Sequence, residues 1–195
     1  MGGGRTSKRM KRTFDLLLAF LFLAFLLLPL LMLALAVRLT SPGPILYWSD
    51  RIGRDNATFK MPKFRSMYSG TPTVATHLLG NPDTHLTSIG SFLRKNSLDE
   101  LPQLWNIIKG DMSFVGPRPA LFNQYDLIEL RTRNGVHNLL PGLTGWAQIN
   151  GRDELPISEK VAFDIEYLNR RSFWFDLRII ITTALKVIKR DNVAH

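Results

Sequence analysis

One uncharged apolar segment restricts the possible structures of this chain more than any other feature of its sequence. From Leu16 to Val37 the sequence reads LLLAFLFLAFLLLPLLMLALAV. About 20 consecutive apolar residues are needed to cross the hydrocarbon core of a bilayer, and a run of this length without a charge is typical of a membrane helix. We therefore predict an N-terminal membrane segment that keeps the rest of the chain close to a lipid surface.

The flanks of this segment are basic on both sides. The cations before it are Arg5, Lys8, Arg9, Lys11 and Arg12, and those after it begin with Arg38, Arg51 and Arg54. Lysine and arginine favour the cytoplasmic side of a membrane, so two basic flanks predict that both ends remain on that side. Pro29 removes one helix hydrogen bond and can bend the helix back as a re-entrant hairpin. A kinked single span is the alternative.

A cleaved signal peptide is a further alternative, because Ala34-Leu35-Ala36 resembles a small-residue cleavage site. The apolar run exceeds the roughly 7 to 15 residues of a secretory signal, which favours a retained anchor. We predict three parts: a basic leader (1–13), a re-entrant membrane helix (14–38) and a catalytic domain at the cytoplasmic face (39–195). The expected fold class is α+β and mainly helical, with a β-hairpin and interfacial amphipathic helices.

The charge balance indicates anionic partners. The formal net charge is +9, which suits nucleic acid, an acidic membrane surface or a phosphorylated substrate without choosing among them. The chain has no cysteine, and its four histidines are scattered singly. A disulfide framework is therefore excluded, and a zinc site has almost no support.

Short elements follow the anchor. Two β-like runs, 45–48 and 57–60, surround the turn-rich RIGRDN and predict a β-hairpin. The Gly-, Pro- and Thr-rich stretch from Gly70 to Thr87 predicts a surface loop. A short helix is expected around 89–95. A longer helix is expected to end near Lys109, with Gly110 as its stop signal.

The C-terminal region predicts an amphipathic basic helix. Leu177, Ile180, Ile181, Ala184, Leu185 and Ile188 recur at helical spacing. Its apolar stripe suits either a protein core or a bilayer surface. Trp174, between two phenylalanines at the start of the helix, makes the bilayer surface an equal alternative.

Two adjacent acids, Asp99 and Glu100, precede the helix that ends near Lys109. With Asp99 as N-cap, Pro102 falls in the first turn, where it costs no hydrogen bond. The helix dipole is then expected to keep the carboxylate ionised. An N-cap with a first-turn acid is also a common structural arrangement, so the pair alone does not show a function.

Cations near the acid pair favour a phosphate ligand. Arg94 and Lys95 precede the pair, and Arg118 lies between Pro117 and Pro119, which restrict its backbone. Two carboxylates can hold Mg²⁺ bridging phosphate oxygens, and an ionised aspartate can itself attack phosphorus. We therefore predict phosphoryl chemistry at Asp99 and Glu100, with Mg²⁺ as cofactor.

Several long motifs resemble one family. In order along the chain they are KRTFDLLLAF, SPGPILY, KFRSM, LRKNSLDELPQLWNIIKGDMSFVGPRP and LPGLTGWAQINGR. Together they resemble the bacterial sugar transferases, which are small monotopic polyprenol-phosphate phosphoglycosyl transferases. The resemblance covers the chain from Lys11 to Arg190.

This resemblance implies that a UDP-sugar loses UMP and that its phospho-sugar passes to polyprenol (undecaprenyl) phosphate, initiating glycoconjugate or polysaccharide synthesis. Asp99 matches the nucleophile and Glu100 the acid associated with Mg²⁺. Residues matching the phosphate-binding positions are Pro117, Arg118 and Pro119, with Arg94, Lys63, Arg65 and Arg152 as cationic support. The family resides at the cytoplasmic face of the bacterial inner membrane. Its anchor usually breaks at Ser-Pro, whereas this chain has Leu28-Pro29.

Other classes remain open at this stage. A membrane-tethered nucleic-acid-binding protein leaves the acid pair unexplained, and no nucleic-acid-binding motif is found. A membrane scaffold predicts that Asp99 matters only as a helix cap, and a phosphatase or sugar-nucleotide hydrolase predicts turnover without lipid. Recognition of the sugar is expected from Gly70–Thr87 and Asn123–Asn138. Self-association into a homo-oligomer is left open.

Overall fold

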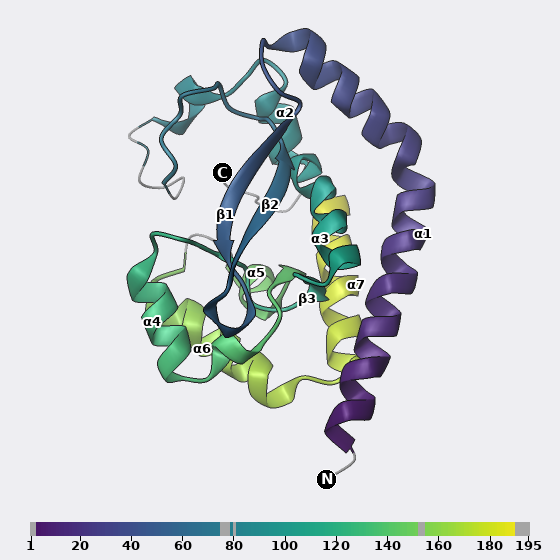
Figure 1. The fold of residues 1–195 in the computed structure, drawn as a ribbon, viewed down its shortest axis with the longest axis vertical. Coiled ribbons are helices and arrows are strands. Elements are labelled where there is room, and N and C mark those ends of the chain that lie inside the picture. Colours follow the sequence, from purple (N-terminus) through teal and green to yellow (C-terminus); the bar gives the residue numbers. More distant parts are fainter. Residues whose placement is uncertain (1–2, 75–78, 80, 152–154, 190–195) are drawn as a thin grey trace.

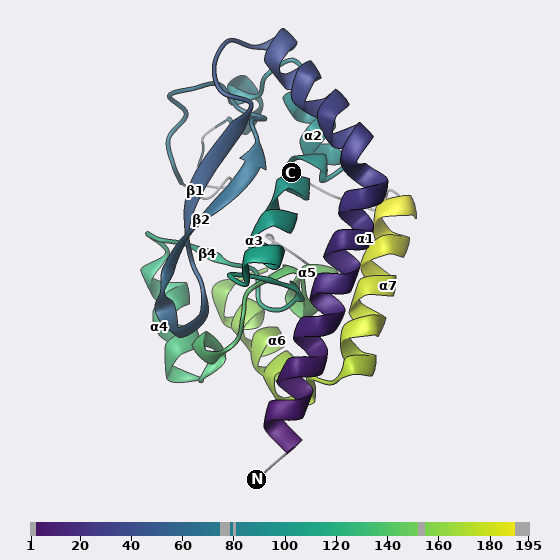
Figure 2. The ribbon, with the colours of Figure 1, turned by 45° about the vertical axis from the view of Figure 1, so that its right-hand side comes forward.

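The apolar segment forms part of one long helix, α1 (Gly3–Thr40), in this computed structural model. The structure describes residues 3–74, 79, 81–151 and 155–189, with side chains from 9 to 187 within those ranges. Pro29 lies inside α1, and the helix axis bends in its C-terminal half (Figures 1 and 2). The structure thus shows one continuous, bent helix that also includes the described part of the basic leader, and the re-entrant hairpin stays a prediction.

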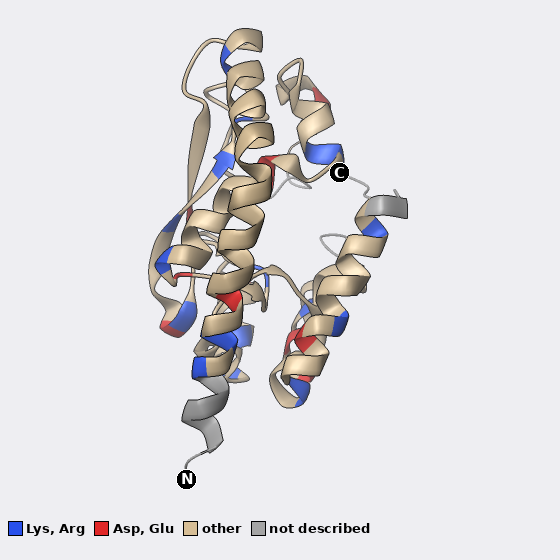
Figure 3. Ribbon diagram, turned by 90° about the vertical axis from the view of Figure 1, so that its right-hand side faces the viewer, with Lys and Arg blue, Asp and Glu red and all other residues tan. Residues whose placement is uncertain are grey.

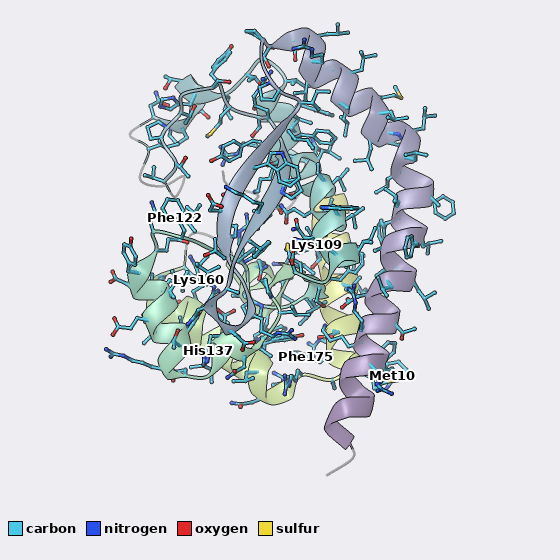
Figure 4. The ribbon with its side chains drawn as sticks, viewed as in Figure 1. Met10, Lys109, Phe122, His137, Lys160 and Phe175 are labelled. Carbon is cyan, nitrogen blue, oxygen red and sulfur yellow. The ribbon has the colours of Figure 1, made fainter. Side chains whose placement is uncertain are left out.

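The middle of α1 has no charged side chain (Figure 3). Phe25 and Leu28 are 76% and 68% exposed and belong to an outer apolar surface, where side chains of α1 project away from the domain (Figure 4). The segment Arg9–Thr40 is long and apolar enough to cross a membrane. Such exposure is unfavourable in water, so this surface is suited to lipid.

A β-hairpin follows, as predicted, with strands longer than the sequence runs suggested. β1 (Leu46–Ile52) pairs antiparallel with β2 (Thr58–Phe64). The turn contains η1 (Arg54–Asn56), where Asp55 has φ 57° and Asn56 has φ 59°. Asp and Asn tolerate this left-handed conformation better than most residues, which explains the turn chemistry of RIGRDN.

The remaining strands are short. β4 (Ala120–Leu121) adds to β1 in the order β2-β1-β4, and β3 (Ser113–Val115) pairs parallel with β5 (Gly142–Thr144). These pairings hold the segment between β3 and β4, which contains the Pro-Arg-Pro motif, against two parts of the domain.

The helices between and after the strands complete the α+β, mainly helical fold. Those before β3 are η3 (Pro82–His85), α2 (Gly90–Lys95), η4 (Leu98–Gln103) and α3 (Leu104–Lys109). Those after β4 are α4 (Tyr125–Arg133), η5 (Val136–Asn138), α5 (Trp146–Ile149), α6 (Ile157–Arg170) and α7 (Phe173–Lys189). The helix expected at 89–95 and the described parts of the predicted 70–87 loop are confirmed, with η3 as a short turn inside that loop.

The main core joins α1, α3, β3, α6 and α7. It includes Ala19 of α1, Ile107 of α3, Tyr167 of α6 and Ile179 of α7. A second cluster packs Val37 of α1 against Phe64 and Leu93. Both halves of α1 therefore pack on the same domain.

The predicted amphipathic helix is confirmed as α7, and its apolar residues serve two surfaces. Phe175 and Ile179 are buried in the core, whereas Trp174, Ile181 and Leu185 are more than half exposed. The core and bilayer interpretations are thus compatible, because each uses a different side of the helix.

Candidate active site

The acid pair lies on the buried face of η4, not at the N-cap that the sequence suggested. Ser97 occupies the cap position with φ 55°, and η4 begins at Leu98. This left-handed residue turns the chain earlier than expected, so Asp99 falls inside the helical segment and Pro102 within a 3-10 turn. The predicted stop at Gly110 is confirmed by its φ of +100°. Asp99, Glu100 and Gln103 are the buried residues of η4.

Glu100 is held by two cations from distant parts of the chain. Lys63 Nζ, near the end of β2, lies 2.8 Å from Glu100 Oε1, and Arg118 Nη2 lies 2.7 Å from the same oxygen. The carboxylate is 8% exposed. Burial by itself raises the pKa of Glu100, but the nearby Arg118 and Lys63 outweigh burial and hold the pKa well below its usual range. Glu100 is therefore ionised at neutral pH.

Asp99 has a weaker electrostatic environment. It is 7% exposed, and Lys63 Nζ is 4.0 Å from its Oδ2. Burial raises the pKa of Asp99; Lys63 opposes that shift, and the neighbouring Glu100 adds to it. The two acids thus differ: one is fixed by cations, and the other is a poorly solvated carboxylate with less compensation. Such an oxygen is a suitable nucleophile once a phosphorus atom reaches it.

The backbone of the Pro-Arg-Pro motif is fixed by three hydrogen bonds. The carbonyl oxygen of Pro117 accepts from Gly142 N (2.9 Å), that of Arg118 from Arg131 Nη1 (2.8 Å), and that of Pro119 from Arg51 Nη1 (3.2 Å). These bonds and the proline rings limit the motion of the backbone that carries Arg118. The guanidinium is therefore presented to Glu100 from a rigid support.

Gly116 explains how this support fits against β5. A Cβ at Gly116 would lie 2.3 Å from the carbonyl oxygen of Leu140, which is backbone. Only glycine allows the two chain segments to approach so closely here. The glycine directly before the motif thus allows the backbone that carries Arg118 to lie close against the segment at Leu140.

The other predicted site residues divide into three groups. Arg94 acts electrostatically on Asp99, and its Nη1 lies 3.7 Å from Met67 Sδ. Arg65 is 4% exposed and donates through Nη2 to the backbone and hydroxyl oxygens of Ser41, at the end of α1. Arg152 lies outside the described residues. Among the predicted cations, the structure brings Lys63, Arg94 and Arg118 to the acid pair.

Sequence reasoning missed a supporting pair, Arg131 and Asp164. Their ion pair measures 2.7 Å and is buried, and Arg131 also binds the Arg118 carbonyl. Arg131 lies four residues after buried Leu127 in α4, and Asp164 three residues after buried Val161 in α6. Charged residues at core-facing helical positions are the signal that could have identified them.

The donor set suits a hard cation. Mg²⁺ is commonly bound through one or two carboxylates together with substrate phosphates and water, and Asp99 and Glu100 provide such oxygens. Within the described residues no group of three or more His, Cys, Asp or Glu side chains is placed to hold a metal. A metal held by Asp99 and Glu100 would therefore take its remaining ligands from water or from a bound phosphate.

Comparisons with known proteins show the family of the chain. Residues 6–190 match the family model described as "Bacterial sugar transferase". The chain is 45% identical over 193 residues to the UDP-glucose:undecaprenyl-phosphate glucose-1-phosphate transferase of Escherichia coli (strain K12), covering 92% of this chain and 40% of that protein. It is 36% identical over 206 residues to the undecaprenyl-phosphate galactose phosphotransferase of Salmonella typhimurium, covering 96% and 42%.

A relative of similar length was also found. The chain is 38% identical over 186 residues to the uncharacterized sugar transferase EpsL of Bacillus subtilis (strain 168), covering 94% of this chain and 90% of that protein. By contrast, it spans about two fifths of the E. coli and Salmonella relatives. The similarity thus covers nearly all of this chain, including the acid pair and the Pro-Arg-Pro motif.

Proposed function

Because the chain belongs to the bacterial sugar transferase family, we propose that it transfers a sugar phosphate from a UDP-sugar to polyprenol phosphate and releases UMP. The names of the E. coli and Salmonella relatives specify undecaprenyl phosphate as acceptor and glucose or galactose as the sugar. The observation that carries this proposal is the buried acid pair, in which Glu100 is fixed by two cations and Asp99 is not. The product is a lipid-linked sugar, which suits the first step of glycoconjugate or polysaccharide synthesis.

The first step is attack by Asp99 on the donor. A carboxylate oxygen of Asp99 forms a bond to the β-phosphorus, the bond from that phosphorus to the bridging oxygen breaks, and UMP leaves with the electron pair. An aspartyl phospho-sugar results. In the second step a phosphate oxygen of polyprenol phosphate attacks the same phosphorus and releases the Asp99 carboxylate, giving polyprenol diphospho-sugar. A covalent intermediate allows a water-soluble donor and a lipid acceptor to use one site in turn.

The surrounding residues have separate roles. Arg118 and Lys63 are placed to exchange part of their contact with Glu100 for the donor phosphates, while Arg94 adds positive charge beside Asp99. Asp99 and Glu100 would hold Mg²⁺, which supplies further neutralisation of phosphate charge when bound. Cations that are already gathered at the site favour the transition state, because they change partners without having to be brought from elsewhere.

We propose a monotopic placement, with both ends of α1 at the cytoplasmic face of the inner membrane. Near its N-terminal end, Arg12 Nη2 donates to the Ile108 carbonyl, 2.7 Å away; at its C-terminal end, Ser41 binds Arg65. A single water-exposed domain cannot lie on two sides of a bilayer. Contacts of one domain with both ends therefore support a re-entrant helix over a full span, with the exposed apolar middle in lipid.

The exposed side of α7 is proposed to lie at the bilayer surface. Trp174, at its start, is 75% exposed, and Ile181 and Leu185 are exposed along the helix. Aromatic side chains suit the headgroup region, and apolar side chains on one side of a basic helix suit the acyl boundary. We expect this placement to bring the acid pair near the depth of the acceptor phosphate.

The direct test is UMP release by the detergent-purified chain with Mg²⁺, polyprenol phosphate and a panel of UDP-sugars, beside Asp99→Asn. We expect multiple-turnover release that depends on the lipid acceptor and is lost in the variant, and the active donor identifies the sugar. Release that continues equally without lipid contradicts the transferase and indicates a hydrolase. Absence of turnover with every donor contradicts the proposal and favours a scaffold.

A further inference from the structure

Gln103 shares the buried face of η4 with the acid pair. It follows Asp99 by four residues, and Asp99, Glu100 and Gln103 are buried while Leu98, Leu101 and Pro102 are only partly so. In a 3-10 helix residues three apart lie one above the other, so Gln103 follows Glu100 on this face, and Asp99 is the chain neighbour of Glu100. The side chain of Gln103 is therefore the third polar group of that face.

The amide nitrogen of Gln103 has no hydrogen-bond partner. Gln103 is 2% exposed, and its Nε2 is buried without an acceptor among the described residues. A buried donor without an acceptor costs free energy, and such groups in native proteins call for an explanation. An apolar side chain of the same shape would avoid this cost.

The cations at this site have acceptors, in contrast to Gln103. Lys63 and Arg118 both bind Glu100, so the acid pair does not lack positive partners. What remains unused is a neutral donor among the buried residues of η4, which also include Asp99. A phosphoryl group has several oxygens that each accept hydrogen bonds.

Neither Asp99 nor Gln103 is open to solvent, because they are 7% and 2% exposed. A donor phosphorus can react with Asp99 only if the groups that bury its carboxylate move aside. Gln103 can contact the same phosphoryl group only if this movement also exposes its amide.

We propose that Gln103 is a further catalytic residue, whose side-chain N–H donates to a non-bridging oxygen of the phosphoryl group while it is bonded to Asp99. This inference rests on the proposed aspartyl intermediate. The amide changes neither its charge nor its covalent bonds; it gains an acceptor as the phosphoryl oxygen arrives. The cost of the unpartnered donor in the resting protein is thereby relieved in the reacting one.

The test is Gln103→Met in the full chain, because methionine has nearly the same shape without a donor. We expect kcat to fall roughly 10²- to 10³-fold, the effect of removing one oxyanion donor, with KM for the UDP-sugar changed less than threefold. The melting temperature is expected to stay the same or rise, since an unpartnered group is removed. A purely structural role for Gln103 predicts a lower melting temperature.

The matched control is Gln148→Met in α5. Its amide is also buried, with neither Nε2 nor Oε1 partnered among the described residues, and it lies outside the η4 face. We expect turnover near that of the wild type. A comparable loss of kcat in this control would show that removing any buried amide lowers turnover, and would overturn the specific role of Gln103.

A second measurement does not depend on turnover. Beryllium trifluoride with Mg²⁺ mimics a phosphoryl group on a carboxylate. It is expected to raise the melting temperature of the wild type and to leave that of Asp99→Asn unchanged. Gln103→Met is expected to lose most of this rise, and an equal rise in wild type and Gln103→Met overturns the inference.

The outcomes separate this inference from the proposed function. A wild type that is inactive with every UDP-sugar and is not stabilised by beryllium trifluoride contradicts the transferase itself. An active wild type with an equally active Gln103→Met contradicts only the role of the amide. If Gln103→Met does not fold, Gln103→Leu, which is also apolar and lacks the donor, is judged by the same criteria.

Discussion

Two buried acid clusters in this chain contain similar residues but have different roles. One contains Asp99 and Glu100 with Lys63 and Arg118. The other contains Asp15 and Asp176, which lie in α1 and α7 and are 2% and 7% exposed, with Lys11 and Tyr167. Both place two carboxylates beside a lysine away from water.

The difference lies in the donors. Asp15 Oδ1 accepts the backbone N–H of Phe114 (3.1 Å), and Asp176 Oδ1 accepts the Tyr167 hydroxyl (2.7 Å) while Lys11 binds its other oxygen. These donors fix α1, β3, α6 and α7 together. In the first cluster the carboxylates face long cationic side chains, which can turn to a phosphate. Fixed donors indicate a structural cluster, and exchangeable ones a reactive cluster.

The largest expected effect is at the reactive cluster. Asp99→Asn removes the proposed nucleophile, so turnover is expected to fall roughly 10⁴-fold or more. The melting temperature is expected to stay the same or rise, because a buried carboxylate with a raised pKa is replaced by a neutral amide. UMP release and a thermal melt measure the two effects. Turnover within tenfold of the wild type contradicts the assignment.

The same change in the structural cluster is expected to act on stability. Asp176→Asn breaks the ion pair with Lys11, and loss of one partner of a buried pair costs about 3 kcal/mol. Chemical denaturation in a fixed detergent measures this change. Below the melting temperature, UMP release per folded chain should remain within a few-fold of the wild type. Lost turnover with unchanged stability would reverse the two roles.

A smaller effect is expected at the Pro-Arg-Pro motif. Arg118→Lys keeps the charge and loses the planar guanidinium that contacts both oxygens of Glu100. We expect kcat/KM for the UDP-sugar to fall roughly 10- to 100-fold, the value of one or two charged hydrogen bonds. Steady-state kinetics test this, with Arg133→Lys on the exposed side of α4 as the matched control.

The smallest expected effect is a shift of the pH profile. The pKa of Asp99 is raised by burial and lowered by Lys63. Attack needs the ionised carboxylate, so activity falls as the pH drops through the pKa of Asp99. Lys63→Met removes a lowering influence and should move this acidic limb to higher pH. If the acidic limb of the pH–activity profile of Lys63→Met stays in place or moves to lower pH, the electrostatic role of Lys63 is contradicted.

Local patterns predicted many elements, whereas tertiary detail required the structure. Turn residues and periodicity were enough to predict the β-hairpin, α2, the helix stop at Gly110 and α7. From the sequence, Lys63 and Arg65 were predicted to have the same role, as cationic support at the active site. They separate because β2 ends at Phe64, so that Lys63 is held in the strand facing Glu100 while Arg65 lies past its end and turns to Ser41.

Two other features had no usable local signal. The N-cap prediction for Asp99 was wrong because Ser97 adopts a left-handed conformation that its sequence neighbours do not require. The Lys11–Asp176 pair joins residues 165 positions apart, and only packing of α1 against α7 brings them together. The acid pair was found because its charges are adjacent in sequence; the structural cluster is assembled entirely by the fold.

The central claim is tested most directly by the intact mass of the protein after incubation with Mg²⁺ and an active UDP-sugar, without polyprenol phosphate. The account predicts an added mass equal to one phospho-sugar, located by peptide mapping at Asp99, with UMP released in an equal amount. Asp99→Asn should gain no mass, and adding polyprenol phosphate should remove the adduct from the wild type. Transfer that needs both substrates together, with no adduct and no UMP released beforehand, would contradict the account.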